Sequence, residues 1–139
     1  MQYTTKLVVD EFTLYKYHVS FLNIIHKFGL TRQQQHILIE MLHQNNKYKD
    51  VPKDIRSDMV LLNTEIRKGI CQKLSIDQGT LNNNISQLRQ MKGLQGAIII
   101  GKELNPAYVV YPDKTNYIAF QLTLRDDVKT NSPERHSEN

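Results

Sequence analysis

The sequence has few of the residues on which covalent or metal-based architectures depend. Its 139 residues include a single cysteine, Cys71. One cysteine excludes both an internal disulfide and a zinc site built from several cysteines. Because Cys71 falls within the apolar pattern of a predicted helix, we interpret it as a small buried side chain rather than as a reactive thiol.

Long apolar segments are also missing. No apolar run approaches the length that crosses a bilayer, and the N-terminal residues precede only the short apolar stretch 7–9, so neither a membrane span nor a signal peptide is predicted. With 40% hydrophobic and 23% charged residues, the composition is that of one ordinary globular domain. We therefore expect a cytoplasmic protein.

The sequence lacks the motifs of common catalytic sites. His36 and His43 are two helical turns apart, about 10 Å at 1.5 Å per residue, which is too far to share a metal ion, and His18 and His26 are no closer in sequence. There is no glycine-rich phosphate loop, nucleophile elbow or paired-carboxylate motif, and the adjacent aspartates 126–127 fall in a predicted tail. We expect no enzymatic activity, no metal and no cofactor.

Acidic residues are scarce in the middle of the chain. Between positions 63 and 102 only Glu65 and Asp77 are acidic, against six basic residues, so this segment carries the whole net charge of +4. Such a concentration is typical of a surface that binds a polyanion, although a solvated helical surface has the same composition. The six basic residues are Arg67, Lys68, Lys73, Arg89, Lys92 and Lys102.

The first part of the chain predicts two helices after a short strand at 6–9. Apolar residues from Phe12 to Phe28 recur every three or four positions, which favours a helix ending near Gly29, although residues 15–19 also alternate as a strand would. Thr31 and Gln34 have the spacing of a capping box at the start of a second helix. Its buried stripe is Ile37, Leu38, Met41 and Leu42.

Between this helix and the basic segment, the polar, proline-containing stretch 45–57 predicts an exposed loop. The apolar run 59–62 resembles a short strand. Near the other end of the chain, 97–100 and 103–104 predict a β-ribbon, and the alternation over 117–124 predicts a half-buried strand. The polar composition after residue 124 predicts a disordered tail.

The basic segment itself predicts two helices, at about 63–74 and 78–91, joined by a tight turn. Asn63 or Thr64 can cap the first helix and Asp77 the second, and glycine at 93 is expected to end the second. A helix-turn-helix needs apolar contacts, a small residue at the closest approach and an apolar plug in the turn. The positions are filled by Ile70, Leu74, Cys71, Ile76, Leu81, Ile85 and Leu88, with Ser75 where glycine is frequent.

The order helix, strand, helix, helix, strand, strand over residues 30–104 resembles the winged helix-turn-helix superfamily. Its most characteristic parts are Leu30-Thr31, the turn at 73–77 and the exit at 88–94; in addition, Leu104-Asn105-Pro106 after a short ribbon is similar to plasmid- and phage-type replication initiator domains. The resemblance implies an α+β fold, with one domain over 1–124 and a tail over 125–139. The helix-turn-helix would occupy about 63–92 and the β-ribbon wing about 96–104, with two helices before them and one strand after.

The resemblance implies sequence-specific binding of double-stranded DNA, as a transcription regulator or a replication initiator, with the second helix in the major groove. Amides pair with adenine and arginine with guanine, and lysines at element ends contact phosphates. The alternative is a protein-binding module in which this helix is plain surface. A homodimer through the N-terminal helix is expected. The predicted base contacts are Gln78, Thr80, Asn82, Asn83, Ser86 and Arg89, with Asn84 nearer the flank, and the predicted phosphate contacts are Lys68, Lys73, Lys92 and Lys102.

Overall fold

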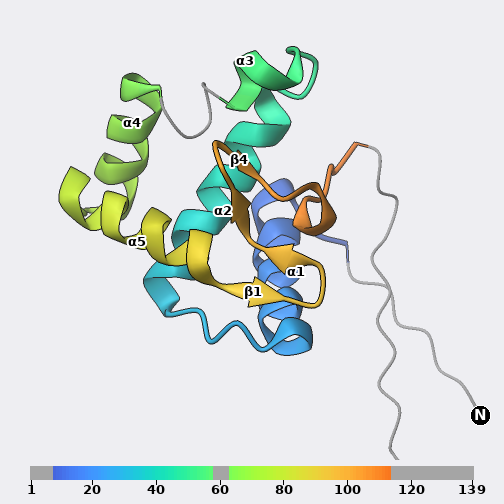
Figure 1. Ribbon diagram of the computed structural model, residues 1–139. Coiled ribbons are helices and arrows are strands. Elements are labelled where there is room, and N and C mark those ends of the chain that lie inside the picture. Colours follow the sequence, from blue (N-terminus) through green and yellow to red (C-terminus); the bar gives the residue numbers. More distant parts are fainter. Residues whose placement is uncertain (1–7, 58–62, 114–139) are drawn as a thin grey trace, which may run out of the picture.

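The computed structural model describes residues 8–57 and 63–113, which form an α+β fold of five helices and two short antiparallel strand pairs. Helix α2 lies in the middle, with α1 on one side and α4 and α5 on the other (Figure 1). The elements are α1 (Glu11–His26), α2 (Arg32–Lys47), α3 (Lys53–Ser57), α4 (Thr64–Leu74), α5 (Gln78–Gln90), β1 (Lys92–Gly93), β2 (Gly96–Ala97), β3 (Ile99–Ile100), β4 (Glu103–Leu104) and the 3-10 helix η2 (Pro106–Tyr108).

Side-chain caps determine where the first two helices begin. The carboxylate of Asp10 accepts a hydrogen bond from the backbone of Thr13 at 2.8 Å, and the predicted capping box of Thr31 and Gln34 is confirmed. Helix α1 ends at His26, and the residue after it, Lys27, adopts the left-handed conformation (φ 54°) two residues before the predicted stop at Gly29. The alternative of a strand over 15–19 is wrong, and residues 8 and 9 of the expected strand at 6–9 are not in a strand.

The stretch 45–57 is not simply the predicted exposed loop. Helix α2 continues to Lys47, and Asn45 is buried, with its amide nitrogen 3.2 Å from the hydroxyl of Tyr111. Pro52 directly precedes α3, where its missing N–H removes no helical hydrogen bond, so it begins a helix instead of preventing one. The predictions for 59–62, 117–124 and 125–139 lie outside the described residues.

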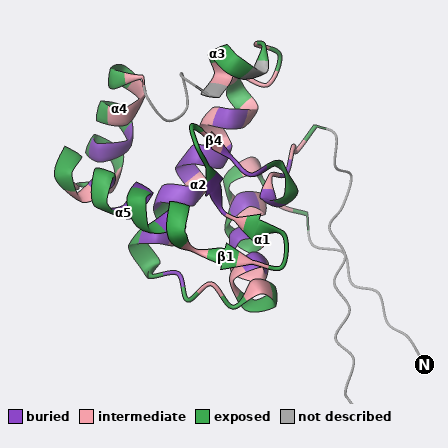
Figure 2. Cartoon of the chain, viewed as in Figure 1, coloured by how far each residue is buried: buried purple, intermediate pink, exposed green. Residues whose placement is uncertain are grey.

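The hydrophobic core lies where α1 and α2 meet α5 and the strands. The buried residues form the inner surfaces of the elements in Figure 2, and the solvent-facing turns of α4 and α5 are mostly exposed. Burial of each large apolar side chain contributes about 1.5–3 kcal/mol, so the amphipathic pattern, more than helix propensity, holds these helices in place. Fully buried members are Tyr15, Val19, Ile37, Met41, Leu42, Leu81, Leu88, Ile98 and Ile99.

The strands form two antiparallel pairs, β1 with β2 and β3 with β4, that follow each other directly in the chain, and we call residues 92–104 the meander. The predicted ribbon at 97–104 is confirmed. Strand β3 pairs with β4, which places Ile99 opposite Leu104 and leaves a turn at 101–102. The pair β1 and β2 comes directly after α5 and was not predicted. Ile98 joins the two pairs, because its N–H donates to Met91 and its carbonyl accepts from Asn105, at 3.1 and 2.8 Å.

Gly93 does not end α5 as predicted; it lies in β1, against the end of α1. A Cβ at this position would come within 2.7 Å of His26 Cβ and 2.8 Å of the ring of Phe28, closer than side chains approach each other in proteins. The next residue, Leu94, donates its backbone N–H to His26 Nδ1 at 3.1 Å. The glycine is therefore required for close approach of the meander to α1, not for its backbone freedom.

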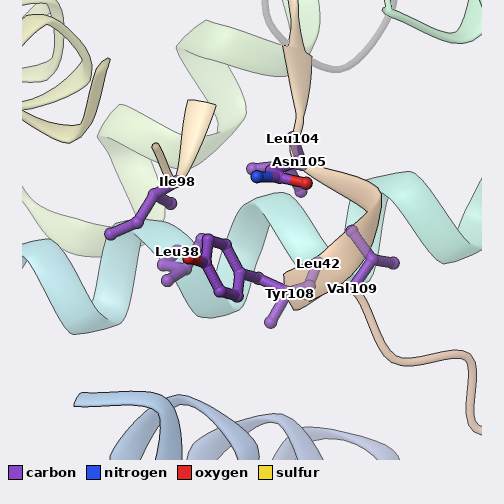
Figure 3. Close-up of a pocket in the computed structure, with 7 residues that line it drawn as sticks. All are labelled: Leu38, Leu42, Ile98, Leu104, Asn105, Tyr108 and Val109. Carbon is purple, nitrogen blue, oxygen red and sulfur yellow. The ribbon is translucent and has the colours of Figure 1, made fainter. Parts of the chain in front are cut away.

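Asn105 and Tyr108 fix the meander to the helical core. The amide of Asn105 donates to the carbonyl oxygens of Gln95 and Ala97, at 2.9 and 2.8 Å, and accepts from the backbone of Ala107. The hydroxyl of Tyr108 donates to Gly96 and accepts from Gln95. Figure 3 shows both side chains beside Leu38, Leu42, Ile98, Leu104 and Val109, where the packing leaves no space for a water molecule.

His18 ties η2 to α1. Its Nε2 lies 2.7 Å from the carbonyl oxygen of Tyr108. Because a carbonyl only accepts, Nε2 carries the proton and donates it. Burial lowers the pKa of His18, so its ring stays neutral at pH values at which an ordinary histidine is already protonated. The position of the meander thus depends on contacts with the middle of α1, through His18, and with its C-terminal end, through His26.

Candidate nucleic-acid interface

Helices α4 and α5 are joined by residues 75–77. Asn63 caps α4 by accepting from the backbone of Ile66, and Asp77 caps α5 by accepting from Thr80, so the two predicted helices and their caps are confirmed. Ser75 adopts a left-handed conformation (φ 57°), and the N–H of Ile76 donates to Cys71. Ser75, which stands where glycine is frequent in such turns, therefore adopts the left-handed conformation that glycine adopts most easily.

The carboxylate of Asp77 occupies the N-terminus of α5. Hydrogen bonds from Thr80, chiefly from its backbone N–H, lower the pKa of Asp77. An ionised carboxylate at this end suits the helix dipole. It also occupies the N–H of Thr80, which could otherwise bind an external anion.

The inner side of α5 contains polar contacts as well as the predicted apolar ones. Asn84, predicted nearer the flank, is buried to 8% exposure, and its amide donates to the carbonyl of Thr80 and to Gln33 Oε1, each at 2.9 Å. Gln87, which was not predicted to contribute, accepts from Gln34 at 2.5 Å. These bonds join α5 to the start of α2 and fix the rotation of α5 about its own axis.

With the inner side fixed, α5 exposes a polar outer face. Five of the six predicted base contacts are exposed there, and Thr80 is half-buried beside its cap. No carboxylate occurs on α5 after Asp77. We name this surface the α5 face (Figure 2); it consists of Gln78, Asn82, Asn83, Ser86 and Arg89.

The α5 face is connected to both neighbouring elements. Arg89 Nε donates to the carbonyl of Gly101 at 3.0 Å, which holds the β3–β4 turn, with the exposed Lys102, beside the C-terminal end of α5. On the other side, Arg67 Nη2 of α4 donates to Asn82 Oδ1. In the sequence Arg67 is one of six basic residues with no predicted role, because only the crossing of α4 and α5 brings it to Asn82.

The four predicted phosphate-contacting lysines divide into two groups. Lys68, Lys92 and Lys102 are exposed on α4, β1 and the β3–β4 turn. Lys73 instead lies 2.9 Å from a carboxylate oxygen of the buried Glu40 and 4.0 Å from the ring centre of Phe12. It borders a groove of about 360 Å³ between α2 and α4, so a phosphate contact from Lys73 would compete with its ion pair to Glu40.

No metal site or membrane span is found in residues 8–57 and 63–113. These residues hold no group of three potential metal-binding side chains, and none of their helices is long and apolar enough to cross a bilayer. The chain matches no protein-family model, no curated protein and no solved structure. The case for a function therefore depends on the geometry of the α5 face.

Proposed function

We propose that the chain is a winged helix-turn-helix protein that binds double-stranded DNA sequence-specifically, as a transcription regulator or a replication initiator. Helix α5 enters the major groove, and the β3–β4 turn acts as the wing that follows the neighbouring backbone. Asn82, Asn83, Ser86 and Arg89 read base edges, while Gln78 and Thr80 lie at the start of the helix, where it first meets the groove.

The observation that carries this proposal is the hydrogen bond from Arg89 to Gly101. This bond keeps the β3–β4 turn, which contains the exposed Lys102, beside the α5 face. That face is rich in amides and has no carboxylate after the N-cap of α5. A plain solvated surface needs no such link between the helix and the ribbon. Lys68 and Lys92 add positive charge on the adjoining elements, as expected where phosphates pass on both sides of an inserted helix.

The proposal predicts a steep dependence of DNA affinity on salt. Contacts from Lys68, Lys92 and Lys102 to three phosphates give a slope of about −2.7 in log affinity against log salt, or a roughly fortyfold loss between about 50 mM and about 200 mM. Titration of the full chain with mixed duplex fragments at both concentrations measures it. Absence of binding at the lower concentration would contradict the proposal.

Exposed apolar residues favour a second candidate, contact with another protein chain through α1. Tyr17, Ile24 and Ile25 are 41%, 66% and 45% exposed on this helix, which lies across α2 from α5. We propose that a second copy of the chain covers them, giving a dimer that presents two α5 helices to two half-sites. Inverted half-sites in DNA selected by the chain are the expected signature; a single unrepeated site contradicts the dimer.

A further inference from the structure

Arg67 and Asn82 form a pair that links α4 to α5 at the centre of the α5 face. Arg67 Nη2 donates to Asn82 Oδ1, and Asn82 is exposed while Arg67 is half-buried. The amide of the neighbouring Asn83 is exposed and has no hydrogen bond with another described residue. Two adjacent asparagines therefore present their amides in different electrostatic surroundings.

The difference matters because the two purines offer different groups in the major groove. Adenine presents an acceptor, N7, and a donor, the N6 amino group, whereas guanine presents two acceptors, N7 and O6. An unengaged amide accepts from N6 and donates to N7, which selects adenine. In Asn82 the amide oxygen already accepts from a guanidinium, which occupies one of its two lone pairs and makes the amide nitrogen the more available group for contact with a base.

The charge of Arg67 acts in the same direction. Its guanidinium is always protonated, and the amino hydrogens of adenine that approach Asn82 Oδ1 would also approach this positive charge. The O6 atom of guanine carries partial negative charge and is attracted instead. Charge-assisted hydrogen bonds are also shorter and stronger than neutral ones, so DNA does not readily displace Arg67 from Asn82.

We propose that Arg67 makes Asn82 specific for guanine, whereas Asn83 is specific for adenine. The inference rests on the proposed function, because it assumes that the α5 face meets base edges. It assigns to α4, the helix outside the groove, a part in sequence selection. Arg67 acts as a positioning residue: it sets which atoms of Asn82 are available without itself needing to contact a base.

Selection from a random duplex pool tests the proposal with four forms of the full chain. The wild type is expected to select guanine at the position contacted by Asn82, which is the position where Asn82→Ala loses its preference. Arg67→Met keeps the aliphatic stem but frees the amide oxygen, so the preference there is expected to change from guanine to adenine, by about tenfold in relative affinity. Lys68→Ala, the matched loss of a neighbouring exposed cation, is expected to lower affinity for all sequences without changing the selected motif.

A measurement on the wild-type protein avoids any effect of the substitution on folding. Replacing the selected guanine by inosine keeps O6 and N7 and is expected to preserve affinity within about twofold, whereas 2-aminopurine, which lacks O6, is expected to lose about tenfold. An unchanged motif for Arg67→Met, or equal binding of the 2-aminopurine and guanine duplexes, overturns the role of Arg67 and leaves DNA binding intact. If the wild type binds no duplex, the proposed function fails and this inference fails with it.

Discussion

Replacement of Asn105 by alanine is expected to destabilise the protein by about 2–4 kcal/mol. The amide of Asn105 is buried and makes three hydrogen bonds with backbone groups of the meander and η2. Alanine leaves two carbonyl oxygens and one N–H without this partner. A fully buried unsatisfied group costs about 1–3 kcal/mol, and water reduces the summed cost here because Gln95 and Ala107 are exposed. The free energy of unfolding, from chemical denaturation followed by circular dichroism, measures the loss.

Asn83→Ala provides the matched control for this substitution. It removes the same amide from an exposed position on α5, where alanine is also the better helix former, so the unfolding free energy is expected to change by less than about 0.5 kcal/mol. If Asn105→Ala were as stable as Asn83→Ala, the amide would not be what fixes the meander.

Ser86→Glu is expected to weaken DNA binding by about 2 kcal/mol or more, roughly thirtyfold in Kd. Ser86 is exposed in the middle of the α5 face. A carboxylate there would face the phosphates of both strands when α5 lies in the groove. It would also attract Arg89, one helical turn along, away from a base. Fluorescence anisotropy with a labelled duplex measures the change in Kd.

Ser86→Gln separates the charge of this substitution from its size. Glutamine has the dimensions of glutamate without the charge, so affinity for mixed duplex is expected to stay within about threefold of the wild type. Both variants are expected to retain wild-type stability, since the position is exposed. Equal losses for Glu and Gln would mean that bulk, not charge, blocks contact; no loss for either would place DNA binding, if present, on another surface.

The helices of the central unit could be predicted from sequence because their signals are local. Asn63 and Asp77 cap through bonds to residues three positions on, and the spacing of Leu81, Ile85 and Leu88 identifies the inner side of α5. The same spacing contained a signal that was not used. Asn84 lies three residues after Leu81 and four before Leu88, which places it on the buried stripe between them.

The features that the sequence did not predict are contacts between residues far apart in sequence. Lys73 has the same local context as other lysines, and only packing of α2 against α4 brings Glu40 to it. Gly93 has the local sequence context of a helix stop, but its role depends on the packing of α1 against β1. For Arg67 no sequence signal points to Asn82, since the contact depends on the crossing of α4 and α5. The composition of residues 63–102 predicted a basic surface that is rich in amides. The individual contacts on that surface depend on the tertiary arrangement.

Methylation interference on a selected duplex tests most directly the central claim that α5 reads the major groove. Dimethyl sulfate modifies guanine at N7, in the major groove, and adenine at N3, in the minor groove. We expect N7 methylation within the selected site to prevent binding and N3 methylation to leave it unchanged, because N7 lies in the major groove, where we propose that the α5 face binds. The reverse result, binding abolished by N3 methylation and insensitive to N7 methylation, would contradict the account.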